Sequence, residues 1–200
     1  MSPNELLSIL TVAEKLKCNT RHADTSTGRR ESVAEHSWRL ALMSMLLEDE
    51  FPKLDMNKVM RMCIIHDLGE AFTGDVPAFD KTEADSALEE KLYREWIESF
   101  PEFQRAQFRE LLDEMEAQST PEARLYKALD KMEAVIQHDE ADISSWLPLE
   151  YDLQLTYGAK EVSYFPYMVK LKETIDRWTR KKIADAGDGA PASFIETEVI

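Results

Sequence analysis

Apolar residues recur at three- and four-residue spacing along most of this 200-residue chain, which is the pattern of amphipathic helices. The first such stretch follows a start signal at Ser2-Pro3 or Asn4. It predicts a helix with one apolar face, made by Leu6, Leu7, Leu10, Ala13 and Leu16. Periodicity is then lost from 20 to 31, where we expect a loop. The sequence contains no internal repeat and no convincing β-hairpin pattern.

The next two predicted helices have clear start signals. Ser32 and Glu35 have the spacing of a capping box, which predicts a helix from Ser32 to about Glu48. Asp55 can cap a following helix that runs to Ile65 and is apolar almost all round. We therefore expect this second helix to be central and buried, with a turn after it.

Four more helical patterns complete the chain. They run from Thr82 through Ile97, from Pro101 through Met115, from Thr120-Pro121 to about Asp139, and through Met168 to Trp178. The segment 144–162 is less regular, and Gly158 ends or interrupts any helix in it. The predicted fold class is all-α, a helical bundle. We expect one domain over 1–183 and an irregular C-terminal tail over 184–200.

The charge balance limits the partners. Lys plus Arg is 24 and Asp plus Glu is 39, which gives a net charge of −15 that repels a polyanionic backbone. We therefore expect no nucleic-acid partner. A small phosphorylated molecule stays possible, because a few arginines and a metal act over short distances. Arg21, His22, Arg29 and Arg30 give the loop 20–31 an unusual basic density.

Cysteine content and hydropathy bear on location. Cys18 and Cys63 are far apart in sequence and provide neither a disulfide framework nor a CxxC zinc site. The first residues lack the basic region of a signal peptide, and no apolar run approaches the roughly 18 residues needed to span a bilayer. We expect a cytoplasmic protein that does not enter a membrane.

The residues with the clearest chemistry are His66 and Asp67, which end an apolar run, with His36 upstream and Asp130 on a later helix. A lone histidine at such a place is more often structural. A buried Asp67, however, also needs a partner, and a metal ion would satisfy both side chains. Imidazole and carboxylate are ligands for zinc, manganese, cobalt or iron, and an incomplete protein shell leaves room for water. This set predicts a hydrolase.

The order H…HD…D resembles that of the HD-domain phosphohydrolases, over roughly residues 20 to 180. The strings SVAEHS, HDLGE, TGD and KALDK are similar to those of the small 5′-nucleotidase branch, which acts on deoxynucleoside monophosphates. The resemblance implies one divalent metal ion (Co, Mn, Zn, Mg, Fe or Ni) held by His36, His66, Asp67 and Asp130. It further implies attack of a metal-activated water on the 5′-phosphate, and a homodimer.

The resemblance also suggests roles for four more residues. Glu70, otherwise a solvated helix-end carboxylate, would orient the water or relay a proton to the leaving 5′-oxygen. Asp75, otherwise a turn residue, would contact a sugar hydroxyl or the leaving oxygen. Arg21 would bind the phosphate. His22 stands where the bacterial branch has a tryptophan that packs against the sugar, so the choice between deoxyribose and ribose stays open.

Two other functions fit the same residues. The substrate can be another phosphorylated nucleotide, cyclic or triphosphate, hydrolysed by the same metal chemistry. Alternatively, the chain binds nucleotides without turnover.

Overall fold

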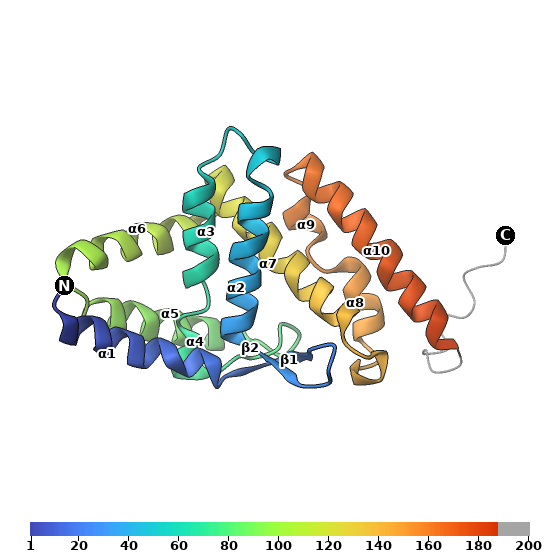
Figure 1. Ribbon diagram of the computed structural model, residues 1–200, viewed down its shortest axis with the longest axis horizontal. Coiled ribbons are helices and arrows are strands. Elements are labelled where there is room, and N and C mark those ends of the chain that lie inside the picture. Colours follow the sequence, from blue (N-terminus) through green and yellow to red (C-terminus); the bar gives the residue numbers. More distant parts are fainter. Residues whose placement is uncertain (188–200) are drawn as a thin grey trace. The chain divides into compact units, whose positions relative to one another are not determined.

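The computed structural model describes residues 1–187, which are predominantly helical with one two-stranded sheet (Figure 1). The predicted all-α fold is confirmed. The chain divides into two compact units, which we describe separately. The first comprises Met1–His22 and Arg30–Tyr126, and the second comprises Ala23–Arg29 and the residues from Lys127 onward. The single-domain organisation over 1–183 stays a prediction.

The first unit opens with α1 (Pro3–Ala13), followed by the short 3-10 helix η1 (Glu14–Lys17). Ser2 caps α1 and forms a capping box with Glu5, so the predicted start at Ser2-Pro3 is confirmed. The predicted apolar face is right at Leu16, which is buried in η1, and wrong for the leucines of α1, because Ile9 and Val12 are the α1 residues that pack against buried clusters. The leucines on the other side are exposed, namely Leu6 at 44%, Leu7 at 61% and Leu10 at 52%.

The predicted loop over 20–31 is also wrong, since it contains β1 (Thr20–Asp24) and β2 (Arg30–Ser32), which pair in a sheet. Gly28 has a φ of +77° at the turn between them, a conformation that favours glycine. The strands are polar and short and lack alternating β-branched residues, which is why their sequence carries no strand signal.

Helices α2 (Val33–Leu46) and α3 (Met56–Ile65) pack side by side in the first unit, with the 3-10 helix η2 (Glu48–Glu50) between them in sequence (Figure 1). Ser32 caps α2 and Asp55 caps α3, as predicted. Much of α3 is buried, but Ile64 is 49% exposed, so this helix is not covered on every side.

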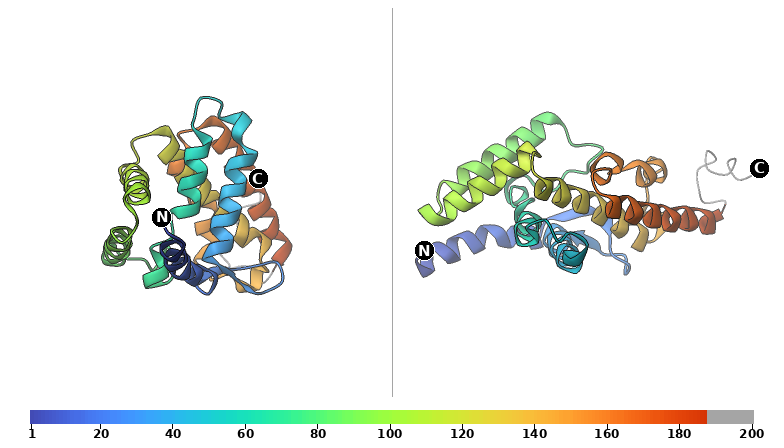
Figure 2. Two further views of the ribbon diagram at one scale, coloured as in Figure 1. Left: turned by 60° about the vertical axis from the view of Figure 1, so that its left-hand side comes forward. Right: turned by 90° about the horizontal axis from the view of Figure 1, so that it is seen from above.

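The rest of the first unit contains α4 (Glu70–Thr73), α5 (Glu83–Ile97) and α6 (Glu102–Ala117). Thr82 caps α5 as predicted, whereas Pro101 occupies the cap position of α6 and not its first turn. Figure 2 shows α5 and α6 running alongside each other. Since α4 also packs against α5, the turn that follows α3 lies against α5.

Helix α7 (Pro121–Glu140) continues from the first unit into the second. The second unit also holds η3 (Ile143–Ser145), α8 (Glu150–Thr156), α9 (Ala159–Val162) and α10 (Pro166–Ala186), and α10 packs against the other three. Gly158, with a φ of +72°, separates α8 from α9. Helix α10 continues past the predicted boundary at 183, and residues 188–200 of the expected tail lie outside the described residues.

Within residues 1–187, no helix combines the length and the apolar character required to cross a membrane.

Candidate active site

Helix ends position three of the predicted metal ligands in the first unit. His36 lies in the first turn of α2, directly after the Ser32 capping box, and is fully buried. His66 is the C-terminal cap residue of α3, and Asp67 follows it. The packing of α2 against α3 therefore brings His36 to residues that lie thirty positions later in the sequence.

The donor atoms of these three side chains all lie within 4.8 Å of one another. The Nε2 atoms of His36 and His66 are 3.3 Å apart, and Oδ2 of Asp67 lies 3.0 Å from Nε2 of His66 and 3.8 Å from Nε2 of His36. Two nitrogens and one carboxylate oxygen around one point are ligands of the type that divalent cations accept.

A backbone carbonyl determines which nitrogen of His66 carries the hydrogen. Nδ1 lies 2.9 Å from the carbonyl oxygen of Cys63, which can only accept, so Nδ1 is the donor. The lone pair of neutral His66 is then on Nε2, which faces the carboxylate of Asp67. Two such acceptors repel at 3.0 Å unless a proton or a cation lies between them. The site therefore fits a bound divalent cation.

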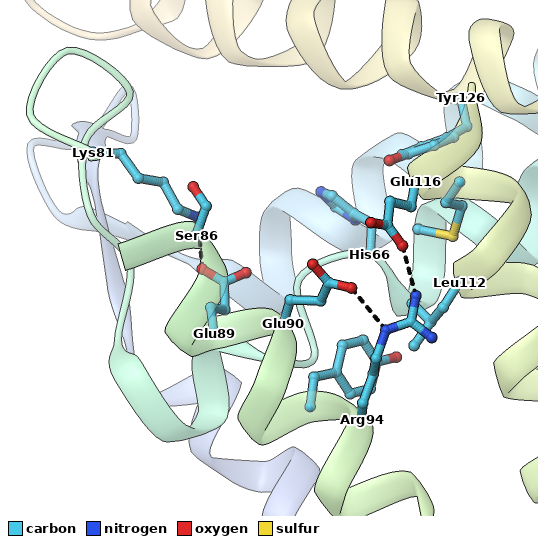
Figure 3. A pocket seen from close by; sticks show the side chains of 11 residues that line it. His66, Lys81, Ser86, Glu89, Glu90, Arg94, Leu112, Glu116 and Tyr126 are labelled. Atoms are coloured by element: carbon cyan, nitrogen blue, oxygen red, sulfur yellow. Dashed lines mark hydrogen bonds and ion pairs between the residues drawn. The ribbon is translucent and has the colours of Figure 1, made fainter. Parts of the chain in front are cut away.

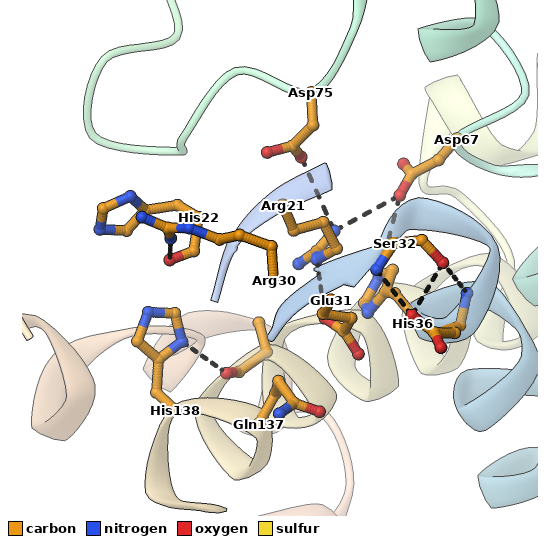
Figure 4. A network of polar contacts seen from close by, with 12 residues as sticks. Arg21, His22, Arg30, Glu31, Ser32, His36, Asp67, Asp75, Gln137 and His138 are labelled. Atoms are coloured by element: carbon orange, nitrogen blue, oxygen red, sulfur yellow. Dashed lines mark hydrogen bonds and ion pairs between the residues drawn. The ribbon is translucent and has the colours of Figure 1, made fainter. Parts of the chain in front are cut away.

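Arg21, at the start of β1, extends its guanidinium toward three carboxylates (Figure 4). Its Nε lies 3.2 Å from Oε2 of Glu31, and its Nη1 lies 3.6 Å from Oδ2 of Asp67 and 3.8 Å from Oδ1 of Asp75. The last two distances are longer than hydrogen bonds. Arg21 is thus placed at the metal-ligand cluster and between the two aspartates.

Glu70 and Asp75 lie on either end of α4 in the first unit. Glu70 is 3% exposed, and its backbone carbonyl accepts a 2.5 Å hydrogen bond from the side chain of Asn19. Burial and the nearby charges of Asp67 and Asp75 raise the pKa of Glu70 to about 10. Burial likewise raises the pKa of Asp75, although the positive charge of Arg21 opposes it.

His22 follows Arg21 in β1, and its ring packs edge-to-face against Phe79 with 5.4 Å between ring centroids. Its backbone carbonyl accepts a hydrogen bond from Arg30. Phe79 lies in the same connection as Asp75. The His22–Phe79 contact therefore joins the strand that carries Arg21 to the connection that carries Asp75. Nothing in the sequence pattern marks Phe79, which is an isolated aromatic residue in a loop.

Asp130 lies in α7, in the second unit, and is 8% exposed. Within that unit its Oδ2 is 2.9 Å from Nζ of Lys127 and 3.7 Å from Nζ of Lys131. These lysines balance its charge. Its role as the fourth metal ligand stays a prediction from the sequence.

His66 also lines a cavity of about 190 Å³ between α5, α6 and the first part of α7 (Figure 3). Lys81 and Glu89, which are joined by a 2.6 Å ion pair, line it as well. Burial raises the pKa of Glu89, although Lys81 opposes this shift. Burial also acts to lower the pKa of Lys81, but the hydrogen bond to Glu89 and the negative charges of Glu89, Glu70 and Asp67 together outweigh it, so the pKa is raised. Both residues were missed by sequence reasoning.

The comparisons with known proteins agree with this geometry. The family described as HD domain matches residues 13–167. The chain is 33% identical over 114 residues to a 5′-deoxynucleotidase named HDDC2 from Homo sapiens, across 56% of this chain and 55% of the human protein. The match thus spans little more than half the length of that relative.

Two other matches cover much more of the chain. A 5′-deoxynucleotidase named YGK1 from Saccharomyces cerevisiae is 27% identical over 198 residues, which are 92% of this chain and 84% of the yeast protein. A crystal structure of a predicted metal-dependent phosphohydrolase from Magnetospirillum magnetotacticum MS-1 is 26% identical, with a TM-score of 0.76, across 94% of this chain and 95% of that one. The predicted resemblance is confirmed, and since the family match covers most of its length, the chain belongs to the HD-domain family.

Proposed function

We propose that this chain is a divalent-metal-dependent phosphohydrolase that removes the 5′-phosphate from deoxynucleoside monophosphates. The observation that carries this proposal is the convergence of His36, His66 and Asp67 on one point, with Arg21 3.6 Å from Asp67. The names of the human and yeast relatives support the substrate class.

His36, His66 and Asp67 would hold the metal ion, with Asp130 as the fourth ligand. When bound, a divalent cation supplies positive charge that activates water and offsets charge on the phosphoryl group. Arg21 would bind the phosphate through its Nη1 edge, since a planar guanidinium suits phosphate oxygens. Its contact with Glu31 fixes the orientation of the guanidinium.

Glu70 and Asp75 would act on the leaving group. Burial, which raises the pKa of Glu70, favours the protonated state, and in that state Glu70 would donate a proton to the departing 5′-oxygen. Asp75 would accept a hydrogen bond from a sugar hydroxyl. The His22–Phe79 pair would pack against the sugar, because aromatic faces and edges suit its apolar side.

We also propose a cytoplasmic homodimer. Cys18 and Cys63 are both free, which suits a reducing compartment. Helix α2 carries an exposed apolar stripe at helical spacing, formed by Trp38, Leu42, Met45 and Leu46. Such a stripe supports self-association. If Trp38→Glu leaves the mass in solution equal to that of the wild type, measured by light scattering, this stripe is not the dimer contact.

The experiment that tests the function is a phosphate-release screen. The protein is stripped of metal, reconstituted with Co, Mn, Zn, Mg, Fe or Ni, and supplied with deoxy- and ribonucleoside monophosphates, triphosphates and cyclic nucleotides. We expect inorganic phosphate from the deoxynucleoside monophosphates. Release of triphosphate instead would favour the triphosphohydrolase alternative, and binding without turnover would favour the non-catalytic one.

Asp67→Asn tests the metal centre in the same screen. We expect it to lower both metal affinity, measured by calorimetry, and phosphate release by more than about 100-fold. Asp49→Asn is the matched control, because Asp49 is exposed in η2, away from the cluster. Equal metal binding in the two variants would contradict the assignment of Asp67.

A further inference from the structure

Helix α5 contacts the turn between His66 and Glu70 at two points. The hydroxyl of Tyr93, a buried residue, donates a 2.9 Å hydrogen bond to the carbonyl oxygen of Ile65. That oxygen also accepts the backbone N–H of Leu68 at 3.2 Å. Tyr93 therefore stabilises the backbone just before His66, where α3 ends.

The second point is Gly69, which precedes Glu70. A Cβ atom at this position would lie 2.9 Å from Cγ of Glu89, 3.3 Å from Cβ of Tyr93 and 3.4 Å from the backbone oxygen of Glu89. Gly69 has an ordinary helical φ of −60°, so the constraint is space and not backbone conformation. The stem of Glu89 thus packs directly on the backbone between Asp67 and Glu70.

The carboxylate of Glu89 is held in turn by Lys81, with 2.6 Å between Nζ and Oε2 (Figure 3). The side chains are 26% and 16% exposed, so this pair is more shielded than a surface ion pair. Lys81 ends the connection that begins at Asp75, and its backbone N–H bonds to the carbonyl of Pro77 at 2.9 Å. One ion pair therefore links the Asp75 connection to the helix that supports Glu70.

We propose that Glu89, paired with Lys81, is a positioning residue that holds the His66–Glu70 turn and the Asp75 connection in the orientation needed for turnover. The inference rests on the proposed function and adds residues that neither the HD pattern nor the relatives' names assign. Electrostatics agree with the geometry, because the charge of Glu89 contributes to the raised pKa of Glu70.

A matched pair of variants on α5 tests this role. Glu89→Gln removes the charge that pairs with Lys81 and keeps the size of the side chain. Glu90→Gln is the control, because Glu90 lines the same cavity but forms its ion pair with Arg94, 2.7 Å away, whereas Glu89 provides the atoms nearest to Gly69 and the ion pair with Lys81. Lys81→Met provides the other half of the proposed pair.

We expect Glu89→Gln to lower kcat by about 10- to 100-fold, with KM and calorimetric metal affinity unchanged, while Glu90→Gln matches the wild type. Lys81→Met should lower kcat to the same degree, and the double variant should lose no more than either single variant. Amide hydrogen exchange should become faster across residues 66–82 in Glu89→Gln and not in Glu90→Gln.

Three results would overturn the inference. The first is equal amide hydrogen exchange and equal kcat in Glu89→Gln and Glu90→Gln. The second is a loss of kcat in the double variant that equals the two single losses added together as free energies. The third is a loss of kcat accompanied by lost metal binding and a lower melting temperature. If the wild type releases phosphate from no nucleotide, the proposed function fails, and the exchange comparison still decides whether Glu89 positions the turn.

Discussion

Nη1 of Arg21 lies 3.6 Å from Oδ2 of Asp67, which places the proposed phosphate-binding cation beside a proposed metal ligand. We predict that Arg21→Met raises KM for a nucleoside monophosphate by about ten- to hundredfold, because hydrogen bonds between charged groups contribute about 1.5–3 kcal/mol. Steady-state kinetics measure this effect. Arg29→Met, an exposed residue of the same basic segment, is the control. A lower kcat at unchanged KM would instead mean that Arg21 acts by holding Asp67 and Asp75.

Glu70→Gln keeps the size of the side chain and removes its acidic proton. We predict a loss of about 10²- to 10⁴-fold in kcat, the usual contribution of proton transfer, with metal affinity close to that of the wild type. Single-turnover phosphate release and calorimetry measure the two quantities. Glu83→Gln, on the exposed first residue of α5, should change neither. Wild-type turnover in Glu70→Gln would exclude a proton-transfer role.

Gly69→Ala introduces the Cβ atom for which α5 leaves no room. We predict a loss of about 1–3 kcal/mol in the free energy of unfolding, the usual cost of overpacking, together with lower kcat. Gly28→Ala is an informative contrast, since nothing lies within 4 Å of its Cβ position and its cost comes from a φ of +77°. Denaturant titration should therefore show a lower free energy of unfolding in both variants. Steady-state kinetics should show a lower kcat in Gly69→Ala alone. Full activity in Gly69→Ala would mean that α5 can shift without effect.

Asp139 introduces a pH dependence into the stability of the second unit. This residue is 2% exposed and accepts a 2.8 Å hydrogen bond from Thr179, and burial raises its pKa from 3.8 to about 6. The pKa of Asp139 is higher in the folded protein than in the unfolded chain, so Asp139 binds its proton more tightly when the protein is folded. Its contribution to the free energy of unfolding is therefore fully present below pH 3.8 and is lost as pH rises through about 6. The total change is at most about 3 kcal/mol.

We predict that Asp139→Asn removes this decrease of unfolding free energy between about pH 4 and 6, as measured by denaturant titration at several pH values. Asp185→Asn, whose side chain is 64% exposed, should keep the wild-type slope. Parallel slopes in wild type and Asp139→Asn would show that another group titrates in this range.

Local signals predicted most of the fold. The capping boxes at Ser2 and Ser32, and the caps at Asp55 and Thr82, are short-range patterns, and the structure has helices at each of them. The strands β1 and β2 were missed because their side chains are polar and their pairing depends on the turn at Gly28. The buried face of α1 was misassigned because Leu6, Leu7 and Leu10 share a helical spacing with the buried Leu16, and only tertiary packing selects Ile9 and Val12.

The candidate site likewise contains residues that the sequence predicts and one that only the folded structure reveals. His66 and Asp67 are adjacent in the chain, so their closeness needs no folding argument. His36 was assigned to the same site from the H…HD…D order, and the packing of α2 against α3 brings it there. Glu89 could not be predicted, because it precedes Glu90 in a charged helix and such residues usually form a solvated face. Its contact with Gly69 exists only through the packing of α5 on the turn.

The two thiols of the chain differ in accessibility, since Cys18 is exposed and Cys63 is buried. A maleimide dye will therefore react at Cys18 in the folded protein without any need to mutate Cys63. The next residue, Asn19, bonds to the backbone of Glu70, so such a dye would sit close to the proposed site in sequence and in space. The natural chain thus already carries a single attachment point for fluorescence measurements of ligand binding.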